Sequence, residues 1–461
     1  MKKKRIIREQ GGMKKRYGKC STEIALVVPM PYRAGMSGLT VYLLQDLLNS
    51  QEDVWCERFF SDIPRSVEWN RPLSDFDVIF ITLQYDRDVE RAYEMIASAN
   101  RDSIIIVGGP VAWINPFVIQ GATFAYIGEI EPQAKQIVEA LRGKSNHERI
   151  CALKEIPGMI YLNEPKVGKL QKVGDMSEAW HPYIQTLPDR EIVALPYYFL
   201  EGSRGCSEFC KFCLLGWTTF PRRDRSVAQI ESLIDGAKKS RRNTISLIGA
   251  GLGFHPKIEE IISSIISRGY SIVPPSFNPR VITEELVSML VRGGQRTLTI
   301  SLESCERIRK ICAKKITDDD IRNAISVSRG KIRRVRIYTM IGLPDERDDD
   351  VLELAKTMHS LKRNAPELHL EATISVFVPK PNTPFQWAGL IDKKEFLHRS
   401  LILRKEAGIP LSITPWEEAA FQLSVDRGQK ILGALDPDTK LPADYIDTGI
   451  PKKSLLNACD L

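Results

Sequence analysis

No apolar run in this sequence is long enough to cross a membrane. The stretch "DSIIIVGGPVAWI" at 102–114 is interrupted by Gly-Gly-Pro, and a spanning helix needs about 20 consecutive apolar residues. The basic start "MKKKRIIREQGG" is not followed by an apolar core, so we expect no secretory signal and a cytoplasmic location. In a reducing compartment, grouped cysteines favour metal ligands or catalytic thiols over disulfides.

The sequence also has no internal repeat and no low-complexity tract. At 461 residues, with 43% hydrophobic and 27% charged residues, it is typical of a globular protein with two or three domains. Much of the net charge of +7 lies near the start, and we interpret residues 1–22 as a basic tail. A disordered tail is the favoured interpretation, and recruitment to an acidic partner or to nucleic acid is the alternative.

Residues 23–145 alternate between buried-strand and helical patterns. The strand-like segments are "EIALVVPMP", "DVIFITLQY", "SIIIVGGP" and "FAYIGEIE", and segments with helical apolar spacing separate them. Strands separated by helices predict a parallel, doubly wound α/β sheet, whose ligands bind beyond the carboxyl ends of the strands. Those ends are rich in Gly and Pro here, so we expect a binding site at that edge.

A connector, 146–195, contains "IPGMIYLNEPKVGKL", in which the Asn-Glu-Pro turn predicts a β-hairpin. Residues 196–389 hold six further strand–helix units, which are too few for an eight-unit barrel and predict a partial (β/α)6 barrel. Residues 390–461 form a small C-terminal extension. The predicted fold class is therefore α/β, with a doubly wound domain ahead of a partial barrel.

Three of the nine cysteines lie in one short segment, "EGSRGCSEFCKFCLLGW". Their spacing is C-x3-C-x2-C, at Cys206, Cys210 and Cys213. The segment follows the first predicted barrel strand, at the mouth where barrel sites form. Thiolates are the usual ligands of iron–sulfur clusters, and three of them leave one iron of a [4Fe–4S] cluster open to an exogenous ligand. A zinc site usually has four ligands, so zinc would need a distant thiol such as Cys305 or Cys312 and is the weaker alternative.

This cysteine spacing, with the aromatic Phe212 before the last cysteine, resembles the radical S-adenosylmethionine (SAM) enzymes. The resemblance implies that "LIGAGLGFHP" lies against the methionine end of SAM and that "YTMIGLPDE" packs on its adenine. Polar residues at the ends of the third and fourth strands would meet its ribose and amino acid parts. The corresponding residues here are Gly249, Gly251, Arg280, Glu303 and Gly342.

The chemistry implied by this resemblance starts at the open iron, which the amino and carboxylate groups of SAM chelate. One electron from an external donor then cleaves the sulfonium, giving methionine and a 5′-deoxyadenosyl radical. That radical abstracts hydrogen from an unactivated carbon, while the protein supplies positioning, tuning of the cluster and exclusion of competing reactions.

The N-terminal series is similar to the cobalamin-binding domain of the class B, cobalamin-dependent radical SAM methyltransferases. The similar segments are "VPMPYRAGMSGLTVYLLQ", "ITLQYD", "VGGPVAWINP" and "YIGEIEP", together with "VFVPKPNTPFQW" in the barrel. The resemblance implies cobalamin contacts at Gly35, Gly38, Tyr85, Gly108, Gly109 and Gly128. None of the six histidines lies in the D-x-H-x-x-G pattern that provides a lower cobalt ligand in many cobalamin domains, so we expect a lower face without histidine.

Both cofactors in one chain imply a C-methyltransferase acting on an unactivated carbon. The chain most resembles archaeal enzymes that methylate a glutamine of methyl-coenzyme M reductase, which implies a protein or peptide substrate and no membrane partner. The charge of +7 also suits RNA. The alternative enzyme modifies RNA or a peptide and keeps its cobalamin-like domain only as a scaffold. An iron–sulfur electron carrier or a cobalamin-binding regulator is the alternative of another class, although a carrier needs protein ligands on all four irons.

Overall fold

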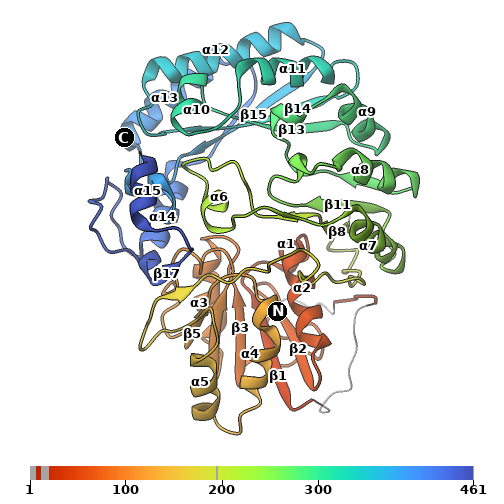
Figure 1. The fold of residues 1–461 in the computed structure, drawn as a ribbon, viewed down its shortest axis with the longest axis vertical. Helices are drawn as coiled ribbons and strands as arrows, with labels where there is room; N and C mark the ends of the chain where they lie inside the picture. Colours follow the sequence, from red (N-terminus) through yellow and green to blue (C-terminus); the bar gives the residue numbers. More distant parts are fainter. Residues whose placement is uncertain (1–6, 12–19, 194–195, 460–461) are drawn as a thin grey trace, which may run out of the picture.

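The computed structural model describes residues 7–11, 20–193 and 196–459. Figure 1 shows the N-terminal sheet in the lower half and the barrel in the upper half, with the C-terminal helices beside them. Most of the predicted basic tail, 1–6 and 12–19, lies outside the described residues. Within the described residues, no helix is both long and apolar enough to span a membrane.

The N-terminal unit is a six-stranded sheet in the order β2-β1-β3-β4-β5-β6. Strands β1 to β5 are parallel, and β6 is antiparallel to β5. The predicted α/β sheet is therefore confirmed. Its strands are β1 Thr22–Val28, β2 Val54–Phe60, β3 Val78–Thr82, β4 Ile104–Gly108, β5 Phe124–Tyr126 and β6 Met159–Tyr161. Its helices are α1 Tyr32–Gly35, α2 Leu39–Ser50, α3 Asp88–Ile96, α4 Ala134–Leu141 and α5 Asn146–Lys154.

Both faces of this sheet are covered, which is why its central strands are apolar throughout. Leu26 and its neighbours on one face pack against α2 and α4. On the other face, Ala25 and Ile79 pack against residues of α3. The carboxyl edge of the sheet points toward the barrel (Figure 1), which brings the Gly-rich strand ends beside the second unit.

Two local patterns in the N-terminal half proved misleading. The predicted hairpin does not form: β6 extends the sheet, and β7 (Gly168–Lys169) pairs in parallel with β17 (Ile446–Asp447) of the C-terminal extension. Strand β2 was not expected, because Glu57 and Arg58 interrupt its apolar run. Both side chains are buried and ion-paired, so the charges are tolerated inside the fold.

The barrel contains the six predicted strands in two parallel sheets, β12-β11-β8 and β13-β14-β15-β16. A bridge between Phe277 and Ile300 joins the sheets, and β16 (Leu411–Ile413) is a seventh strand from the extension. The predicted strands are β8 Tyr198–Glu201, β11 Thr244–Ile248, β12 Ser271–Val273, β13 Thr297–Glu303, β14 Arg334–Ile341 and β15 His369–Val376. The helices between them are α6 Leu214–Thr218, α7 Val227–Lys239, α8 Ile258–Ser267, α9 Glu284–Arg292, α10 Glu306–Ile311, α11 Asp318–Ser328 and α12 Asp348–Asn364.

Local sequence explains most of these barrel elements. Helix α7 begins at a capping box of Ser226 with Gln229, which satisfies backbone donors at the helix start. Along β13, buried and partly exposed residues alternate, so Leu298 and Ile300 join the barrel core and Glu303 lies on the opposite, polar side. Because side chains alternate across a strand, polar groups collect inside the partial barrel.

The C-terminal extension contacts both units. It contains α13 Lys393–Glu406, α14 Trp416–Arg427 and α15 Lys452–Cys459. Glu418 in α14 forms a two-pronged ion pair with Arg87, at 2.8 and 2.9 Å, and the Val425 carbonyl accepts a hydrogen bond from Asn115. These contacts join the N-terminal unit to the extension.

Candidate functional site

The three clustered cysteines occupy the loop between β8 and α6, in the middle of the molecule (Figure 1). Gly205 precedes the first cysteine with a φ of +78°, and a Cβ there would lie 2.4 Å from the Thr219 carbonyl oxygen. Only glycine fits such a position. The Trp217 indole donates to the Cys210 carbonyl, and the Lys211 N–H donates to the Cys312 carbonyl. The loop is thus fastened on both sides.

The thiols of Cys206, Cys210 and Cys213 lie close enough to interact electrostatically. Burial raises the pKa of Cys210 to about 12, and it also raises the pKa of Cys213; the neighbouring thiols add to both increases. Bound iron would offset this cost, because metal ligation deprotonates cysteine. Among the described residues, no three His, Cys, Asp or Glu side chains meet as ligands of one metal ion.

The predicted Gly-rich segment lies directly beside this loop. A Cβ on Gly249, whose φ is +158°, would lie 2.4 Å from the Ser203 Oγ, and one on Gly251 would lie 3.8 Å from the Cys206 Sγ. The segment's backbone therefore approaches the cysteine loop closely because it has no side chains there. A ligand bound along it would reach the thiols.

The other residues predicted for SAM have separate partners. Arg280 pairs with Glu208 of the cysteine loop at 2.9 Å, and Glu303 pairs with Lys314 at 2.9 Å. The Gly342 N–H donates to Glu346 at the end of β14. Phe212 packs against the barrel core. Arg280 and Glu303 thus do not pair with each other; each faces its own element near the cysteine loop.

A cavity of about 580 Å³ lies between the carboxyl edge of the N-terminal sheet and the barrel mouth. Gly38, Gly108, Gly109, Gly128 and Gly249 of the predicted residues line it. Gly35 lies elsewhere, under the Phe60 ring, and Tyr85 is 68% exposed and outside the lining. The structure thus brings four of the six residues predicted for cobalamin to one cavity that also touches the SAM segment.

The cavity wall has features of a ligand site. Apolar residues from the sheet, Leu26, Phe80 and Ile106, form part of its lining. Two polar atoms of lining residues, Trp113 Nε1 and Ser203 Oγ, are buried and have no hydrogen-bond partner among the described residues. Buried polar groups are normally paired, so these atoms point to a ligand with polar groups. No histidine is among the described residues that line the cavity.

A charge network that local sequence did not reveal closes one side of this cavity. Arg204, two residues before the first cysteine, pairs with Glu129 at 3.2 Å, Glu131 at 2.7 Å and Glu201 at 2.9 Å. Arg223 also pairs with Glu129, at 2.8 Å. Glu129 and Glu131 follow β5 of the N-terminal sheet, so the network ties that sheet to the cysteine loop. In the sequence, only the segment "SRGC" indicates that Arg204 lies beside the first cysteine. The three carboxylates that pair with it are brought there by tertiary contacts.

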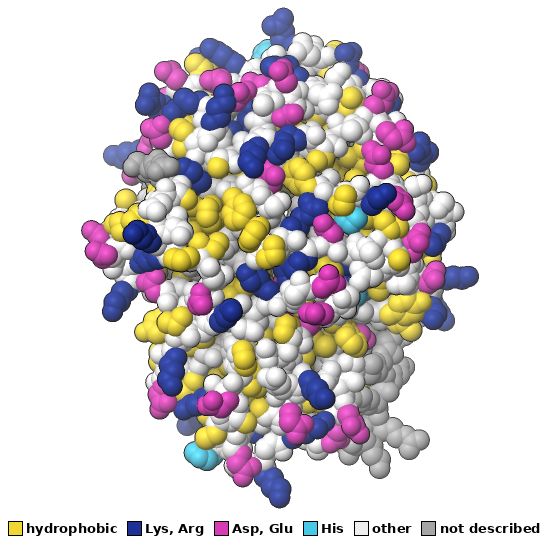
Figure 2. Space-filling model, in the orientation of Figure 1, with side chains coloured by type: hydrophobic (Ala, Val, Ile, Leu, Met, Phe, Trp, Pro, Cys, Tyr) yellow, Lys and Arg dark blue, Asp and Glu magenta, His cyan; other side chains and the backbone are white. Residues whose placement is uncertain are grey.

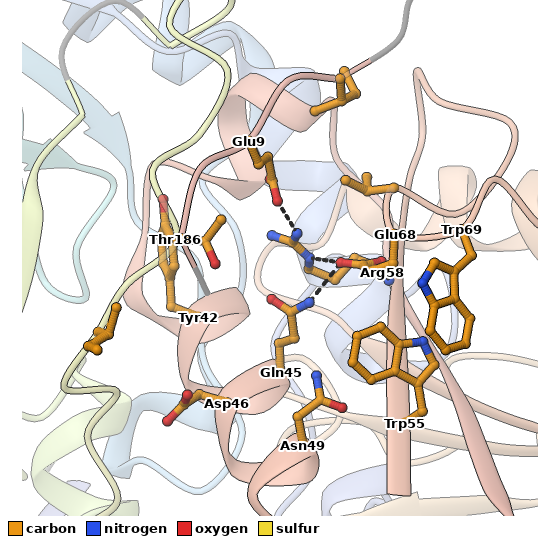
Figure 3. Close-up of a pocket in the computed structure, with 14 residues that line it drawn as sticks. Glu9, Tyr42, Gln45, Asp46, Asn49, Trp55, Arg58, Glu68, Trp69 and Thr186 are labelled. Carbon is orange, nitrogen blue, oxygen red and sulfur yellow. Dashed lines mark hydrogen bonds and ion pairs between the residues drawn. The ribbon is translucent and has the colours of Figure 1, made fainter. Parts of the chain in front are cut away.

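A smaller cavity of about 350 Å³ lies between residues 7–11, α2 and β2 (Figure 3). Arg58 lies at its centre and pairs with Glu9 and Glu68, and Gln45 donates to the same Glu68. Most of its polar side chains form hydrogen bonds or ion pairs with one another. We therefore interpret the cavity as the place where ion pairs attach residues 7–11 to the N-terminal unit.

Comparison with known proteins agrees with this geometry. Residues 200–358 match the model of the radical SAM superfamily, and residues 40–161 match that of radical SAM proteins, N-terminal. The chain contains a radical SAM domain. Such a domain implies a [4Fe–4S] cluster and SAM, and the cysteine loop and Gly-rich segment of this radical SAM protein fit them.

Two relatives come from Methanocaldococcus jannaschii. The uncharacterized protein MJ0966 is 28% identical over 443 residues, which is 94% of this chain and 95% of that protein. The uncharacterized protein MJ1620 is 20% identical over 376 residues, which is 68% of this chain and 71% of that protein. Likeness to MJ0966 therefore extends over both units and the extension.

Among solved structures, the radical SAM methyltransferase TsrM from Kitasatospora setae, with cobalamin and a [4Fe–4S] cluster bound, matches with a TM-score of 0.61 and 14% identity. The match covers 80% of this chain and 77% of TsrM. The cobalamin-dependent SAM radical enzyme OxsB matches with a TM-score of 0.54 and 17% identity, over 73% of this chain and 51% of OxsB. These likenesses confirm the predicted two-unit α/β fold.

Proposed function

We propose that this radical SAM protein is a cobalamin-dependent C-methyltransferase. The observation that carries the proposal is the single cavity of about 580 Å³, which extends from the edge of the doubly wound sheet to the Gly-rich segment beside the cysteine loop. A cobalamin held by the sheet and a SAM held by the barrel would then face each other. The fold shared with TsrM and OxsB supports the same proposal.

The cysteine loop and its neighbours would hold the first two cofactors. Cys206, Cys210 and Cys213 would bind three irons of the cluster, and the backbone at 249–251, which approaches the cysteine loop closely, would lie against SAM. Glu303 and Arg280 place a carboxylate and a guanidinium near the cysteine loop for the charged and polar parts of SAM. When bound, the cluster and SAM supply a strongly reactive 5′-deoxyadenosyl radical, and cobalamin supplies a transferable methyl group.

The sheet edge would hold cobalamin. The close backbone approaches at Gly109 and Gly128, whose φ values are +98° and +112°, leave room at the switch point of the sheet. The apolar lining of the cavity would accommodate the nucleotide tail, and Trp113 Nε1 and Ser203 Oγ would be donors for its amide or phosphate oxygens. We propose that the lower face of cobalt carries no histidine, since the described lining contains none.

We propose a protein side chain as the substrate, with a glutamine of methyl-coenzyme M reductase as the first candidate and an external one-electron donor as the source of electrons. Two hydrophobic side chains beside the cysteine loop, Leu215 and Phe220, are 40% and 41% exposed. Figure 2 shows hydrophobic side chains gathered at this height of the molecule. Exposed apolar side chains of this kind would suit contact with a polypeptide, whereas RNA recognition depends mainly on cations and on rings that stack with bases.

The test is an anaerobic reaction of the full chain, reconstituted with iron and sulfide and supplied with hydroxocobalamin, titanium(III) citrate and SAM carrying a trideuterated methyl group. The peptide substrate carries the candidate glutamine, and a matched peptide carries asparagine there. We expect 5′-deoxyadenosine, S-adenosylhomocysteine and a label on a glutamine carbon by mass spectrometry. Labelling in the absence of cobalamin would overturn the cobalamin step, and 5′-deoxyadenosine without any methyl transfer would favour the scaffold-only alternative.

A further inference from the structure

One buried lysine beside the cysteine loop, Lys314, has no role in the proposals above, although its ion-pair partner Glu303 does. The Lys314 Nζ lies 2.9 Å from the Glu303 Oε1, and each side chain is 13% exposed. Lys314 follows α10 in the chain, whereas Glu303 ends β13. A buried ammonium is costly unless it is paired, and here the nearest described groups include thiols that would ligate iron.

The backbone holds both residues firmly in place. Glu303 has a φ of +64° at an irregular point of the β13–β14 pairing, a conformation that is uncommon outside glycine. The Lys314 N–H donates to the Arg309 carbonyl at 2.8 Å, and the Cys312 carbonyl accepts from Lys211 of the cysteine loop at 2.9 Å. The turn that carries Lys314 is therefore attached to the same loop that carries the cysteines.

The charge of Lys314 acts on the thiols as well as on Glu303. Burial raises the pKa of Cys210 and Cys213, and the Lys314 ammonium opposes that rise at both. The Glu303 carboxylate acts in the other direction and raises the pKa of Cys210. The pKa of Lys314 is itself raised above its usual value by Glu303 and by these thiols, although burial lowers it. Lys314 therefore stays protonated at neutral pH.

We propose that Lys314 is a positioning residue that holds a fixed positive charge against the cluster ligands, favours the reduced cluster, and releases Glu303 to the amino group of SAM when SAM binds. Reduction adds one electron from an external one-electron donor, so the cluster and its thiolates become more negative by one charge. A nearby cation in a low-dielectric site stabilises that added charge, and net charge near a cluster sets its reduction potential. The inference rests on the cluster and not on methylation.

Two variants are expected to shift the potential in opposite directions. Lys314→Met removes the cation and should make the cluster harder to reduce. Glu303→Gln leaves the cation without its carboxylate and should make the cluster easier to reduce. Lys310→Met is the matched control, because Lys310 is 74% exposed on α10 and pairs with Glu306.

The experiment is a dye-mediated potentiometric titration of the anaerobically reconstituted full chain without SAM, followed by electron paramagnetic resonance of the reduced cluster. At a set potential, Lys314→Met should lower the ratio of reduced to oxidised cluster about tenfold, which corresponds to about 59 mV for a one-electron couple. Lys314→Arg should restore most of the difference, and Lys310→Met should titrate like the wild type. If Lys314→Met loses iron, the inference is tested by the reduction potentials of Glu303→Gln and Lys314→Arg instead.

Binding of a non-reactive SAM analogue, measured by calorimetry, provides the second result. Glu303→Gln should weaken binding, whereas Lys314→Met should not, since it leaves Glu303 free for the amino group. Two results would overturn the inference. One is that Lys314→Met keeps all its iron and has the wild-type reduction potential. The other is that Lys314→Met and Glu303→Gln shift the reduction potential in the same direction. Activity of the methylation reaction plays no part in these measurements, so failure here and failure of the proposed function are distinguishable.

Discussion

Replacing Arg204 with Met should loosen the contact between the N-terminal sheet and the cysteine loop. The side chain of Arg204 is 12% exposed and pairs with three carboxylates. In the variant, Glu129 keeps Arg223 as a partner. Glu131 and Glu201 have no second ion pair among the described residues, so the variant leaves two nearly buried carboxylates with only the more distant charge of Arg225 for compensation.

The size of the effect follows from this loss. Breaking a buried ion pair by removing one partner costs about 3–5 kcal/mol. We expect about 3 kcal/mol, the lower end, because the carboxylates face a cavity that water can enter. An opening equilibrium that shifts by about 3 kcal/mol accelerates amide exchange on the order of a hundredfold, since about 1.4 kcal/mol corresponds to tenfold.

Hydrogen exchange followed by mass spectrometry measures this opening locally, without requiring the whole chain to unfold in one step. The informative peptides cover 124–131 and 198–204, on the two sides of the contact. Arg87→Met is the control, because Arg87 also joins the N-terminal unit to another part of the chain, but its pair with Glu418 is about half-exposed and such pairs contribute about 0–1 kcal/mol.

Two results would refute this reasoning. If Arg204→Met accelerates exchange by less than about fivefold, which is about 1 kcal/mol, the carboxylates do not need the guanidinium. If Arg87→Met loosens the 124–131 peptide as much as Arg204→Met does, burial does not decide the strength of these pairs.

Three further outcomes are expected. Gly128→Ala should lower the thermal midpoint by several degrees, because its Cβ would lie 2.3 Å from a facing backbone oxygen at a φ of +112°; Gly38→Ala, which meets nothing within 4 Å, should not, and equal midpoints would contradict the clash. Burial raises the pKa of Asp426 to about 7, above its unfolded value, so this group contributes stability at low pH that is lost as the pH rises through 7. Asp426→Asn should therefore be more stable than the wild type at pH 8 and similar to it at pH 4; a pH-independent difference in thermal midpoint would contradict this. Cys213→Ala should lose iron, the cluster absorbance and 5′-deoxyadenosine formation, while the exposed Cys151→Ala should keep all three; full iron in Cys213→Ala would refute the cluster assignment.

Several elements could be predicted because their causes are local. The three cysteines and the glycines at 249 and 251 lie within short segments; the cysteine spacing indicated a cluster loop, and the family resemblance implied the close backbone approach at the glycines. The alternating strand and helix patterns predicted both parallel sheets, since periodicity follows from each residue's immediate neighbours. The Gly- and Pro-rich segments that end the apolar runs likewise predicted where the strands end, and the carboxyl ends of parallel strands lie at one edge of the sheet.

Other elements were decided by partners far away in the chain. The apolar pattern of β2 is interrupted by Arg58, and only Glu9 and Glu68 make that charge tolerable in the interior. The expected hairpin lost its second strand, because β7 pairs with β17 near the other end of the chain. Local turn chemistry could not reveal that competing partner.

The amino-acid sequence by itself predicted the cysteine loop and the Gly-rich segment as candidate cofactor-binding segments, because cysteine spacing and backbone freedom at glycine are properties of a few adjacent residues. Only the tertiary structure decided that those segments enclose one cavity, that Tyr85 and Gly35 stay outside it, and that Arg204 and Lys314 sit against the cysteine loop. The physical reason is electrostatic: a buried charge is stable only beside a compensating charge, and that partner comes from an element that folding, not sequence proximity, brings near.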